Sequence, residues 1–205
     1  MRIPILMTLI LALPMVAAAN IPDLSNCHAE MPDGPLPRYL MVTPSGLGPA
    51  MSDGRIDGGG YFSAVITLTL ANGNGDPIAN YPAEDVWLMD ECGAMAYCAL
   101  AIPDGPTDEN GQTDFIGPYA AGGHMPADCL IEVLLAGSPL WEPGLELRFN
   151  SPDINGDNVV NLTDITLFAQ TLGGDYAYHC DYNWDGVVSL TDIVVFAGSI
   201  GVVCQ

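Results

Sequence analysis

Residues 153–173 read DINGDNVVNLTDITLFAQTLG, and residues 181–201 read DYNWDGVVSLTDIVVFAGSIG. The two stretches align without a gap at an offset of 28, and 12 of the 21 aligned positions are identical. Such self-similarity indicates an internal repeat. The identities include acidic and amide residues at positions 1, 3, 5 and 12, and are not limited to apolar residues. This duplicated segment therefore decides the structure expected for the C-terminal end of the chain.

The polar positions match an EF-hand-type calcium loop. Such a loop supplies side-chain oxygens from positions 1, 3, 5, 9 and 12 and a backbone carbonyl from position 7, because calcium requires about 6 to 8 oxygen ligands. We name residues 153–164 loop 1 and residues 181–192 loop 2. The expected ligands are Asp153, Asn155, Asp157, Val159, Asn161 and Asp164 in loop 1, and Asp181, Asn183, Asp185, Val187, Ser189 and Asp192 in loop 2. The sequence thus predicts a protein that binds two calcium ions.

Position 6 tests this interpretation, because the loop turns sharply there and favours a left-handed residue. Gly186 meets this requirement in loop 2, and Asn158 in loop 1 is one of the few other residues that tolerate the conformation. Without an ion, carboxylates about 4 Å apart would repel by roughly 4 kcal/mol per pair at an effective dielectric of 20. We therefore expect the loops to be ordered only when calcium is bound.

A helix is expected to begin directly after position 12 of each loop, because apolar residues then recur at helical spacing. These residues are Ile165, Phe168 and Leu172 after loop 1, and Ile193, Phe196 and Ile200 after loop 2. The valines at position 8, Val160 and Val188, are expected to pair across the two loops as a short β bridge.

Paired calcium loops with Asp at position 12, one outgoing helix each and a C-terminal location resemble dockerin domains, which attach proteins to cohesin receptors. The resemblance covers residues 153–201. It implies that positions 10 and 11, which are Leu162, Thr163, Leu190 and Thr191, contact the receptor. Since both repeats carry the same pair, it also implies docking in either of two orientations. The chain departs from many dockerins late in the helix, where a basic residue is replaced by Gln170 and Gly198.

The residues before the repeats predict a β domain. Between residues 62 and 70, apolar side chains alternate with Ser and Thr, which is typical of a strand with one buried face. Glycine and proline then punctuate short apolar runs at fairly regular intervals. Further strands are expected at residues 40–43, 85–89, 97–102, 113–116, 129–135 and 145–149. About seven short strands without a long helical period predict an antiparallel sandwich.

Two segments of this region resemble bacterial immunoglobulin-like domains of the invasin and intimin type. They are ITLTLANGNGDPIANYPAEDVWL (66–88) and TDENGQTDF (107–115). The resemblance implies an immunoglobulin-like β-sandwich. The fold expected is therefore mainly β with a small α module, divided into a signal peptide (1–19), a sandwich (20–150) and a dockerin-like domain (151–205).

Export is expected from the N-terminus, where Arg2 precedes an apolar stretch and three alanines end at residue 19. Six cysteines in an exported chain favour disulfides, and six allow fifteen pairings. We expect Cys180 to pair with Cys204, since both lie in the C-terminal domain. Two further bridges are then expected among Cys27, Cys92, Cys98 and Cys129. The expected location is extracellular or on the cell surface.

The chain has four arginines, no lysine and a formal net charge of −21, so it lacks the clustered basic residues that phosphate binding requires, and nucleic acid is an unsuitable partner. No stretch after the signal predicts a membrane span. Motifs of known hydrolases and phosphate-binding enzymes are absent from the sequence, which favours a protein that is not an enzyme. His28 and His179 lie beside cysteines but lack zinc-ligand spacing.

Three functions remain open from the sequence. The first is an anchoring protein that docks through its calcium-loaded repeats onto a cohesin-type receptor. The second is a structural surface or appendage subunit, in which the repeats pack against their own β domain. The third is a protein that binds or cleaves carbohydrate through the loops of the sandwich. Exposure of positions 10 and 11 would favour docking, and their burial against the β domain would favour the structural role.

Overall fold

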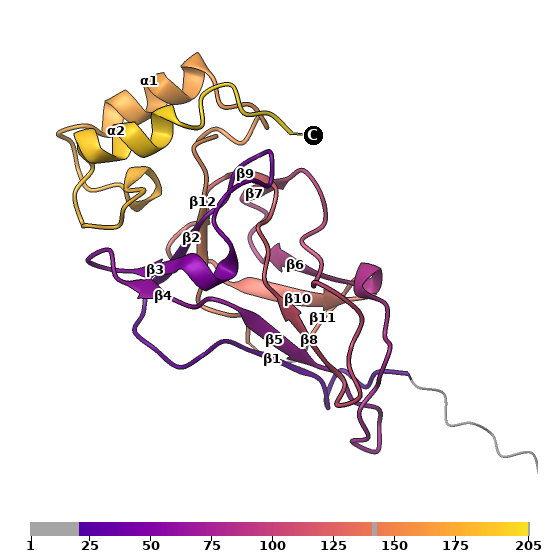
Figure 1. The fold of residues 1–205 in the computed structure, drawn as a ribbon. Coiled ribbons are helices and arrows are strands. Elements are labelled where there is room, and N and C mark those ends of the chain that lie inside the picture. Colours follow the sequence, from indigo (N-terminus) through magenta and orange to yellow (C-terminus); the bar gives the residue numbers. More distant parts are fainter. Residues whose placement is uncertain (1–20, 141–142, 205) are drawn as a thin grey trace, which may run out of the picture.

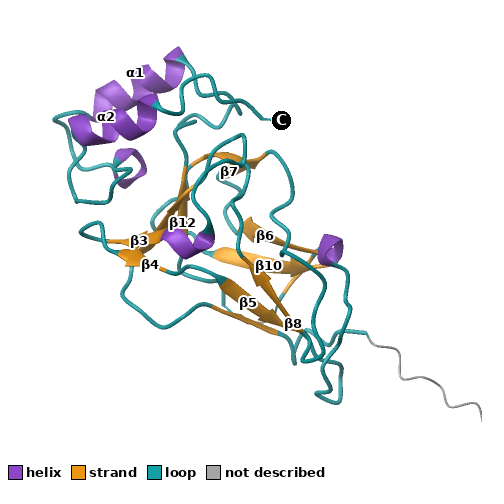
Figure 2. Ribbon diagram, viewed as in Figure 1, coloured by secondary structure: helices purple, strands orange, loops and turns teal. Residues whose placement is uncertain are grey.

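The computed structural model describes residues 21–140 and 143–204, and the expected signal peptide lies outside these ranges. The fold is mainly β, with two α-helices close to the C-terminus (Figures 1 and 2). We call residues 21–150 the β part and residues 151–204 the C-terminal repeats. Figure 1 shows the repeats gathered at one end of the β strands. The helices of the described ranges are all too short or too polar to cross a bilayer.

Within residues 21–140 and 143–204, twelve short strands form four small sheets. The first sheet has the antiparallel order β1 (His28–Glu30), β5 (Ile66–Thr69), β8 (Gln112–Phe115). The second has the antiparallel order β11 (Ser138–Pro139), β10 (Ile131–Leu135), β6 (Val86–Asp90). The third has the order β12 (Arg148–Asn150), β2 (Arg38–Met41), β3 (Gly54–Ile56), β4 (Tyr61–Phe62). The fourth is the antiparallel pair β7 (Met95–Tyr97) and β9 (Ala121–Gly123).

Each of the seven predicted strands overlaps an observed strand, namely β2, β5, β6, β7, β8, β10 and β12 in chain order. One pairing differs from the all-antiparallel prediction, because β12 runs parallel to β2, with Phe149 opposite Leu40. This parallel pair has a structural consequence. The chain leaves β12 beside β2, so the C-terminal repeats begin next to the sheet that carries Tyr39.

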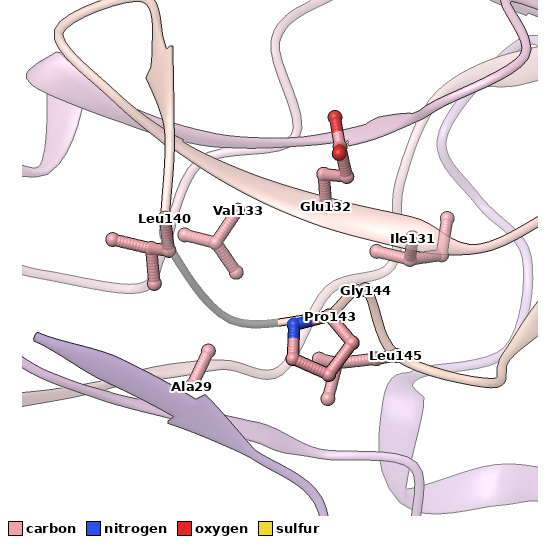
Figure 3. Close-up of a pocket in the computed structure, with 8 residues that line it drawn as sticks. All are labelled: Ala29, Ile131, Glu132, Val133, Leu140, Pro143, Gly144 and Leu145. Atoms are coloured by element: carbon pink, nitrogen blue, oxygen red, sulfur yellow. The ribbon is translucent and has the colours of Figure 1, made fainter. Parts of the chain in front are cut away.

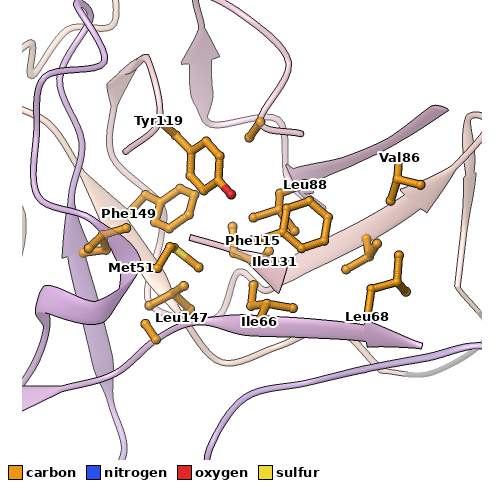
Figure 4. Packing of buried hydrophobic residues seen from close by; sticks show 14 of the residues in the cluster. Met51, Ile66, Leu68, Val86, Leu88, Phe115, Tyr119, Ile131, Leu147 and Phe149 are labelled. Atoms are coloured by element: carbon orange, nitrogen blue, oxygen red, sulfur yellow. The ribbon is translucent and has the colours of Figure 1, made fainter. Parts of the chain in front are cut away.

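One hydrophobic core lies between the sheets of the β part. Alternate residues of β5, Ile66 and Leu68, are fully buried and face Leu88 of β6 and Ile131 of β10 (Figure 4). Phe115 of β8 is also fully buried in this core. The period-two alternation in the sequence therefore corresponds to one buried face of a strand.

A second, smaller cluster lies within the C-terminal repeats. It contains Ile154, Val160, Phe168, Cys180, Tyr182 and Phe196, with Met41 of β2 packed at its edge. The rings of Phe168 and Phe196 lie 5.3 Å apart between centroids. These two residues come from α1 (Leu162–Thr171) and α2 (Leu190–Ala197), so the two helices pack through the apolar positions that the sequence predicts.

Both α-helices begin earlier than predicted. Their first residues, Leu162 and Leu190, are loop position 10, not the residue after position 12. The cause is N-terminal capping: the side chains of Asn161 and Ser189 accept a hydrogen bond from the backbone two residues later, which starts the helix inside the loop. Three single-turn 3-10 helices complete the structure: η1 (Met51–Asp53), η2 (Ala83–Asp85) and η3 (Tyr178–Cys180).

The predicted bridge between Val160 and Val188 is wrong. Val160 pairs instead with the C-terminal strand segment, because its backbone N–H donates to Val202 and its carbonyl accepts from Gly201, both at 2.8 Å. Val159 also forms a bridge with Val203. The last residues of the chain are therefore held against loop 1.

This arrangement explains why the predicted Cys180–Cys204 disulfide is also wrong. The disulfides are Cys92–Cys129 and Cys98–Cys204, and Cys27 and Cys180 are free thiols. The pairing of the C-terminal segment with loop 1 carries Cys204 toward Cys98, whereas Cys180 is buried in the second cluster. Only one bridge therefore lies within the β part, and the other joins the two parts of the chain.

Candidate metal-binding loops

The two loops share an unusual backbone shape. At position 6, Asn158 and Gly186 have φ of 68° and 91°, as the sequence predicts. At position 4, Gly156 and Trp184 also have positive φ, of 69° and 53°. A left-handed conformation costs a non-glycine residue about 1–2 kcal/mol, so Trp184 must be held by its surroundings. The repeat in sequence is thus a repeat in backbone conformation.

In loop 1, the carboxylates at positions 1 and 12 lie inside the loop and accept backbone hydrogen bonds. Asp153 accepts from the N–H groups of Asp157 and Asn158, at 3.2 and 2.7 Å. Asp164 accepts from Asn155 and Asn161, at 3.2 and 2.9 Å. The loop therefore winds around its two buried carboxylates.

Loop 2 repeats this pattern. Asp181 accepts from the N–H of Gly186 at 2.9 Å, and Asp192 accepts from Tyr182 and Ser189 at 2.8 and 2.9 Å. The Tyr176 hydroxyl also donates to Asp181, at 2.9 Å. Tyr176 lies between the two repeats, so the spacing of loop positions in the sequence does not identify it.

The side chains at positions 3 and 5 lie beside one another at the mouth of each loop. The amide nitrogens of Asn155 and Asn183 donate to Asp157 and Asp185, each at 2.9 Å. Asp157 and Asp185 are exposed to solvent. Each loop thus has buried carboxylate oxygens at positions 1 and 12 and exposed carboxylate oxygens at position 5.

The buried aspartates have an unfavourable environment for negative charge. Asp153, Asp164, Asp181 and Asp192 are all fully buried. Burial raises the pKa of Asp153, and the neighbouring carboxylates of Asp164 and Asp157 raise it further. Burial likewise raises the pKa of Asp181, with a further rise from the charges of Asp192 and Asp185. A cation in each loop would stabilise this charge.

Asp181 gives the most direct sign that a cation fits. Its Oδ1 atom is buried and has no hydrogen-bond partner among the described residues. The arginines of the described chain do not supply the missing partner, because the guanidinium groups of Arg38, Arg55 and Arg148 donate to backbone carbonyls elsewhere. An oxygen-only donor set of this kind suits a hard divalent cation such as calcium.

The loop carboxylates do not converge as closely as those around a bound ion. Within residues 21–140 and 143–204, the one group of three acidic, histidine or cysteine residues with ligand atoms all within 4.8 Å is Asp90, Cys92 and Cys129. That group offers no thiolate, because Cys92 and Cys129 are joined in a disulfide. In loops 1 and 2 the carboxylates accept hydrogen bonds from backbone N–H groups, so ion binding would require their oxygen atoms to move closer to one another.

Loop 1 is attached to the β part through its backbone. The N–H of Gly123 in β9 donates to the carbonyl of Asp153 at 2.7 Å. A Cβ atom at Gly122 would overlap the Asp153 carboxylate. Asn158 Oδ1 also lies 3.5 Å from the sulfur of Cys98, beside the disulfide to Cys204. Position 1 of loop 1 is therefore buried by β9.

Loop 2 is attached to the β part through an aromatic side chain. The ring of Trp184 stacks on Tyr39 of β2, with centroids 6.0 Å apart and planes 18° apart. Only 4% of the Trp184 surface is exposed. Beneath it, a Cβ atom at Gly59 would lie 3.0 Å from the Asn183 carbonyl oxygen, so loop 2 rests closely on the turn between β3 and β4.

Two histidines, one from each part of the chain, form a further contact between the parts. His124 follows β9 and His179 lies in η3, and their rings stack with centroids 4.0 Å apart. Burial and the neighbouring His124 lower the pKa of His179 to about 4, and burial lowers the pKa of His124. Both rings are therefore neutral at neutral pH, which allows them to stack without repulsion.

The residues implied in receptor binding are exposed to solvent. Leu162 and Leu190 are 73% and 75% exposed, and their neighbours Thr163 and Thr191 are exposed as well. Val194, one turn along α2, is 74% exposed. None of these five side chains contributes to the second hydrophobic cluster.

One small pocket of the β part has too little space for an organic ligand. It lies between Ala29, Val133, Leu140 and Leu145 and has a volume of about 20 Å³ (Figure 3). A single water molecule needs about 10–15 Å³ on this measure. This pocket is a packing space, and it gives no support for a substrate site.

Comparison of the chain with known protein families, with curated proteins and with solved structures gives no match.

Proposed function

We propose that this chain is an exported anchoring protein whose calcium-loaded, dockerin-like repeats bind a cohesin-type receptor and display the β part. The observation that carries the proposal is the exposure of Leu162, Thr163, Leu190 and Thr191. Two apolar side chains of this size, each about three-quarters exposed at the same position of a repeat, do not stabilise the chain on its own. Burial of these side chains by a partner would stabilise the complex.

Calcium would act by neutralising the loop aspartates and fixing the helices that present these residues. The ligands would be the side chains at positions 1, 3, 5, 9 and 12 and the carbonyls of Val159 and Val187. The buried Asp181 oxygen without a partner supports this assignment. At a free calcium concentration 100 times the dissociation constant, each site would stabilise the fold by about 2.7 kcal/mol.

The β part would be an immunoglobulin-like sandwich. What supports this is the single core shared by the sheets β1-β5-β8 and β11-β10-β6, together with strands whose residues alternate between buried and partly exposed. The parallel β2–β12 pair is an addition to the antiparallel pattern. This part would be the displayed module.

A structural surface subunit is the second candidate, and a different observation favours it. The disulfide Cys98–Cys204 and the stacking of Trp184 on Tyr39 join the repeats to their own β part. Leu162, Thr163, Leu190 and Thr191 remain exposed in the presence of these contacts. A rigid connection within the chain is therefore compatible with docking, and a receptor test separates the two functions.

The test mixes purified cohesin modules of several types with the full chain and separates the mixture by native gel electrophoresis. One gel contains calcium at about 2 mM, on the order of the concentration at which extracellular modules bind it, and the other contains EDTA. Docking predicts a complex in calcium only. Because the two repeats carry the same pair, Leu162→Asp or Leu190→Asp alone should leave one orientation available and preserve the complex. The double variant should abolish it.

Leu100→Asp is the matched control, since Leu100 is an exposed leucine of the β part, 58% exposed. It should bind as the unsubstituted chain does. The docking function is contradicted if no cohesin type binds, or if the complex forms equally well in EDTA. The first outcome would favour the structural function, and the second would show that docking does not depend on calcium.

A further inference from the structure

The chain differs from a symmetric pair of calcium loops at position 4, and this difference lies at the contact between its two parts. In loop 1 the residue is Gly156, which has no side chain. In loop 2 it is Trp184, which is left-handed, almost fully buried and stacked on Tyr39. A bulky residue in this conformation is a genuine outlier and persists only when its surroundings hold it there.

Two groups of contacts hold Trp184. On the β part, Tyr39 stacks on its ring and fixes its own position by donating to Asp57 at 2.9 Å. On the loop, Trp184 lies between two expected ligands, Asn183 and Asp185. Their side chains are bonded to each other, and the N–H of Asp185 donates back to Asn183 Oδ1 at 3.0 Å.

We propose that loop 2 is a calcium-controlled contact between the two parts, in which the ion holds Trp184 against Tyr39. This rests on the calcium binding proposed above. The ion draws Asn183 and Asp185 inward on either side of Trp184, and this fixes the left-handed backbone that places the indole on Tyr39. When the ion leaves, Trp184 relaxes and the contact opens.

Loop 1 cannot act in the same way. Its attachment consists of the hydrogen bond from Gly123 to the Asp153 carbonyl and the nearby disulfide Cys98–Cys204. These bonds remain when loop 2 opens. The repeats therefore stay attached at loop 1, and calcium changes the contact at loop 2.

Trp184 has space into which it can move. A hollow of about 440 Å³ lies beside it, between loop 2 and the strands that carry Arg55 and Tyr61. The indole can leave Tyr39 through this hollow without disturbing the core of the β part. Coupling between two sites is reciprocal, so the Tyr39 contact must in turn strengthen calcium binding by loop 2.

The experiment uses the full chain with Trp87→Phe and Trp141→Phe, so that Trp184 is the single tryptophan. In calcium its emission should be blue-shifted and poorly quenched by acrylamide. With EDTA the emission should move to longer wavelength, and the quenching constant should rise at least twofold. Asp185→Ala should show the EDTA behaviour even in calcium.

Asp157→Ala is the matched control, because it removes the equivalent ligand of loop 1. It should leave the Trp184 response to calcium unchanged. Reciprocity is tested by calorimetry: Tyr39→Ala should weaken calcium binding at loop 2 at least threefold and leave loop 1 unaffected. Tyr39→Phe keeps the stacked ring and should bind calcium as the unsubstituted chain does, which separates loss of the contact from general misfolding.

The outcomes separate this inference from the proposed function. If calorimetry shows two calcium ions but EDTA leaves the quenching of Trp184 unchanged, the controlled contact is wrong and calcium binding stands. Equal responses in Asp157→Ala and Asp185→Ala would also overturn it, since the effect would not belong to loop 2. If loop 2 binds no calcium, both proposals fail together.

Discussion

Four buried aspartates place negative charge away from solvent, which is energetically costly. Asp153, Asp164, Asp181 and Asp192 are fully buried in a chain with a formal net charge of −21. Backbone N–H groups stabilise each carboxylate in part. Burying an ionised carboxylate without a counter-charge is costly, so such groups are normally paired or bind a metal. We propose that one calcium ion in each loop supplies the missing counter-charge.

Gly122 gives a residue-scale prediction. Gly122→Ala should destabilise the fold by about 1–3 kcal/mol, the usual cost of an overpacked site, because the added methyl group would overlap the Asp153 carboxylate. The same change should weaken calcium binding at loop 1 and spare loop 2. Urea denaturation and calorimetry measure the two effects. Gly105→Ala is the control, since a Cβ there meets nothing within 4 Å.

Sequence spacing identified the loop positions but not every residue around them. Positions 1, 3, 5 and 12 are visible because each carries the same residue at a fixed offset. Trp184 breaks the repeat, so comparison of the two loops gave it no role. A tryptophan at a position that is glycine in the other repeat was the available signal. Gly122 and Tyr176 lie outside the loops and come close to them only through the fold.

At the scale of elements, the two α-helices depend on each other. They have 10 and 8 residues, and isolated helices shorter than about 12–15 residues are marginal in water. Their stability must therefore come from capping by Asn161 and Ser189 and from the packing of Phe168 on Phe196. The inner faces of the helices stabilise the repeats, and the outer faces are free for a partner.

Substitutions on the two faces should therefore have different effects. Phe168→Ala should cost about 3–5 kcal/mol, as expected for a buried aromatic residue. Leu162→Ala should change stability by no more than about 0.5 kcal/mol, because the side chain is largely exposed. Chemical denaturation in calcium gives both values. A large loss of stability in Leu162→Ala would mean that this face already packs within the chain.

The strands were predicted where the sequence shows either alternation or an apolar run between glycines and prolines. Alternation identified β5, and apolar runs identified β2, β6, β7, β8, β10 and β12. β1, β3, β4, β9 and β11 have two or three residues, too few for alternation to be recognised. The helices begin three residues before the predicted start, because capping at position 9 starts them inside the loop.

At the scale of the whole molecule, the disulfide Cys98–Cys204 determines how the two parts are connected. It closes a loop with a sequence separation of 106. Pairing of cysteines within one domain predicts Cys180 as the partner of Cys204, and this prediction is wrong. Which distant cysteines meet depends on the tertiary structure, here on the pairing of the chain end with loop 1.

Peptide mapping without reduction should therefore recover a Cys98–Cys204 peptide and free Cys27 and Cys180. Cys204→Ser should destabilise the chain by about 2–5 kcal/mol, since a loop of about 100 residues is released in the unfolded state. Denaturation under oxidising conditions measures this loss. Recovery of a Cys180–Cys204 peptide would contradict the connection between the two parts.

Calorimetric titration of calcium into the full chain tests the central claim that both loops bind the ion. We expect two binding events in the unsubstituted chain and one in each of Asp153→Ala and Asp181→Ala, with Glu109→Ala, an exposed acidic control, unchanged. The unfolding temperature should also fall in EDTA. A chain that binds no calcium and unfolds at the same temperature in EDTA and in calcium would contradict the account.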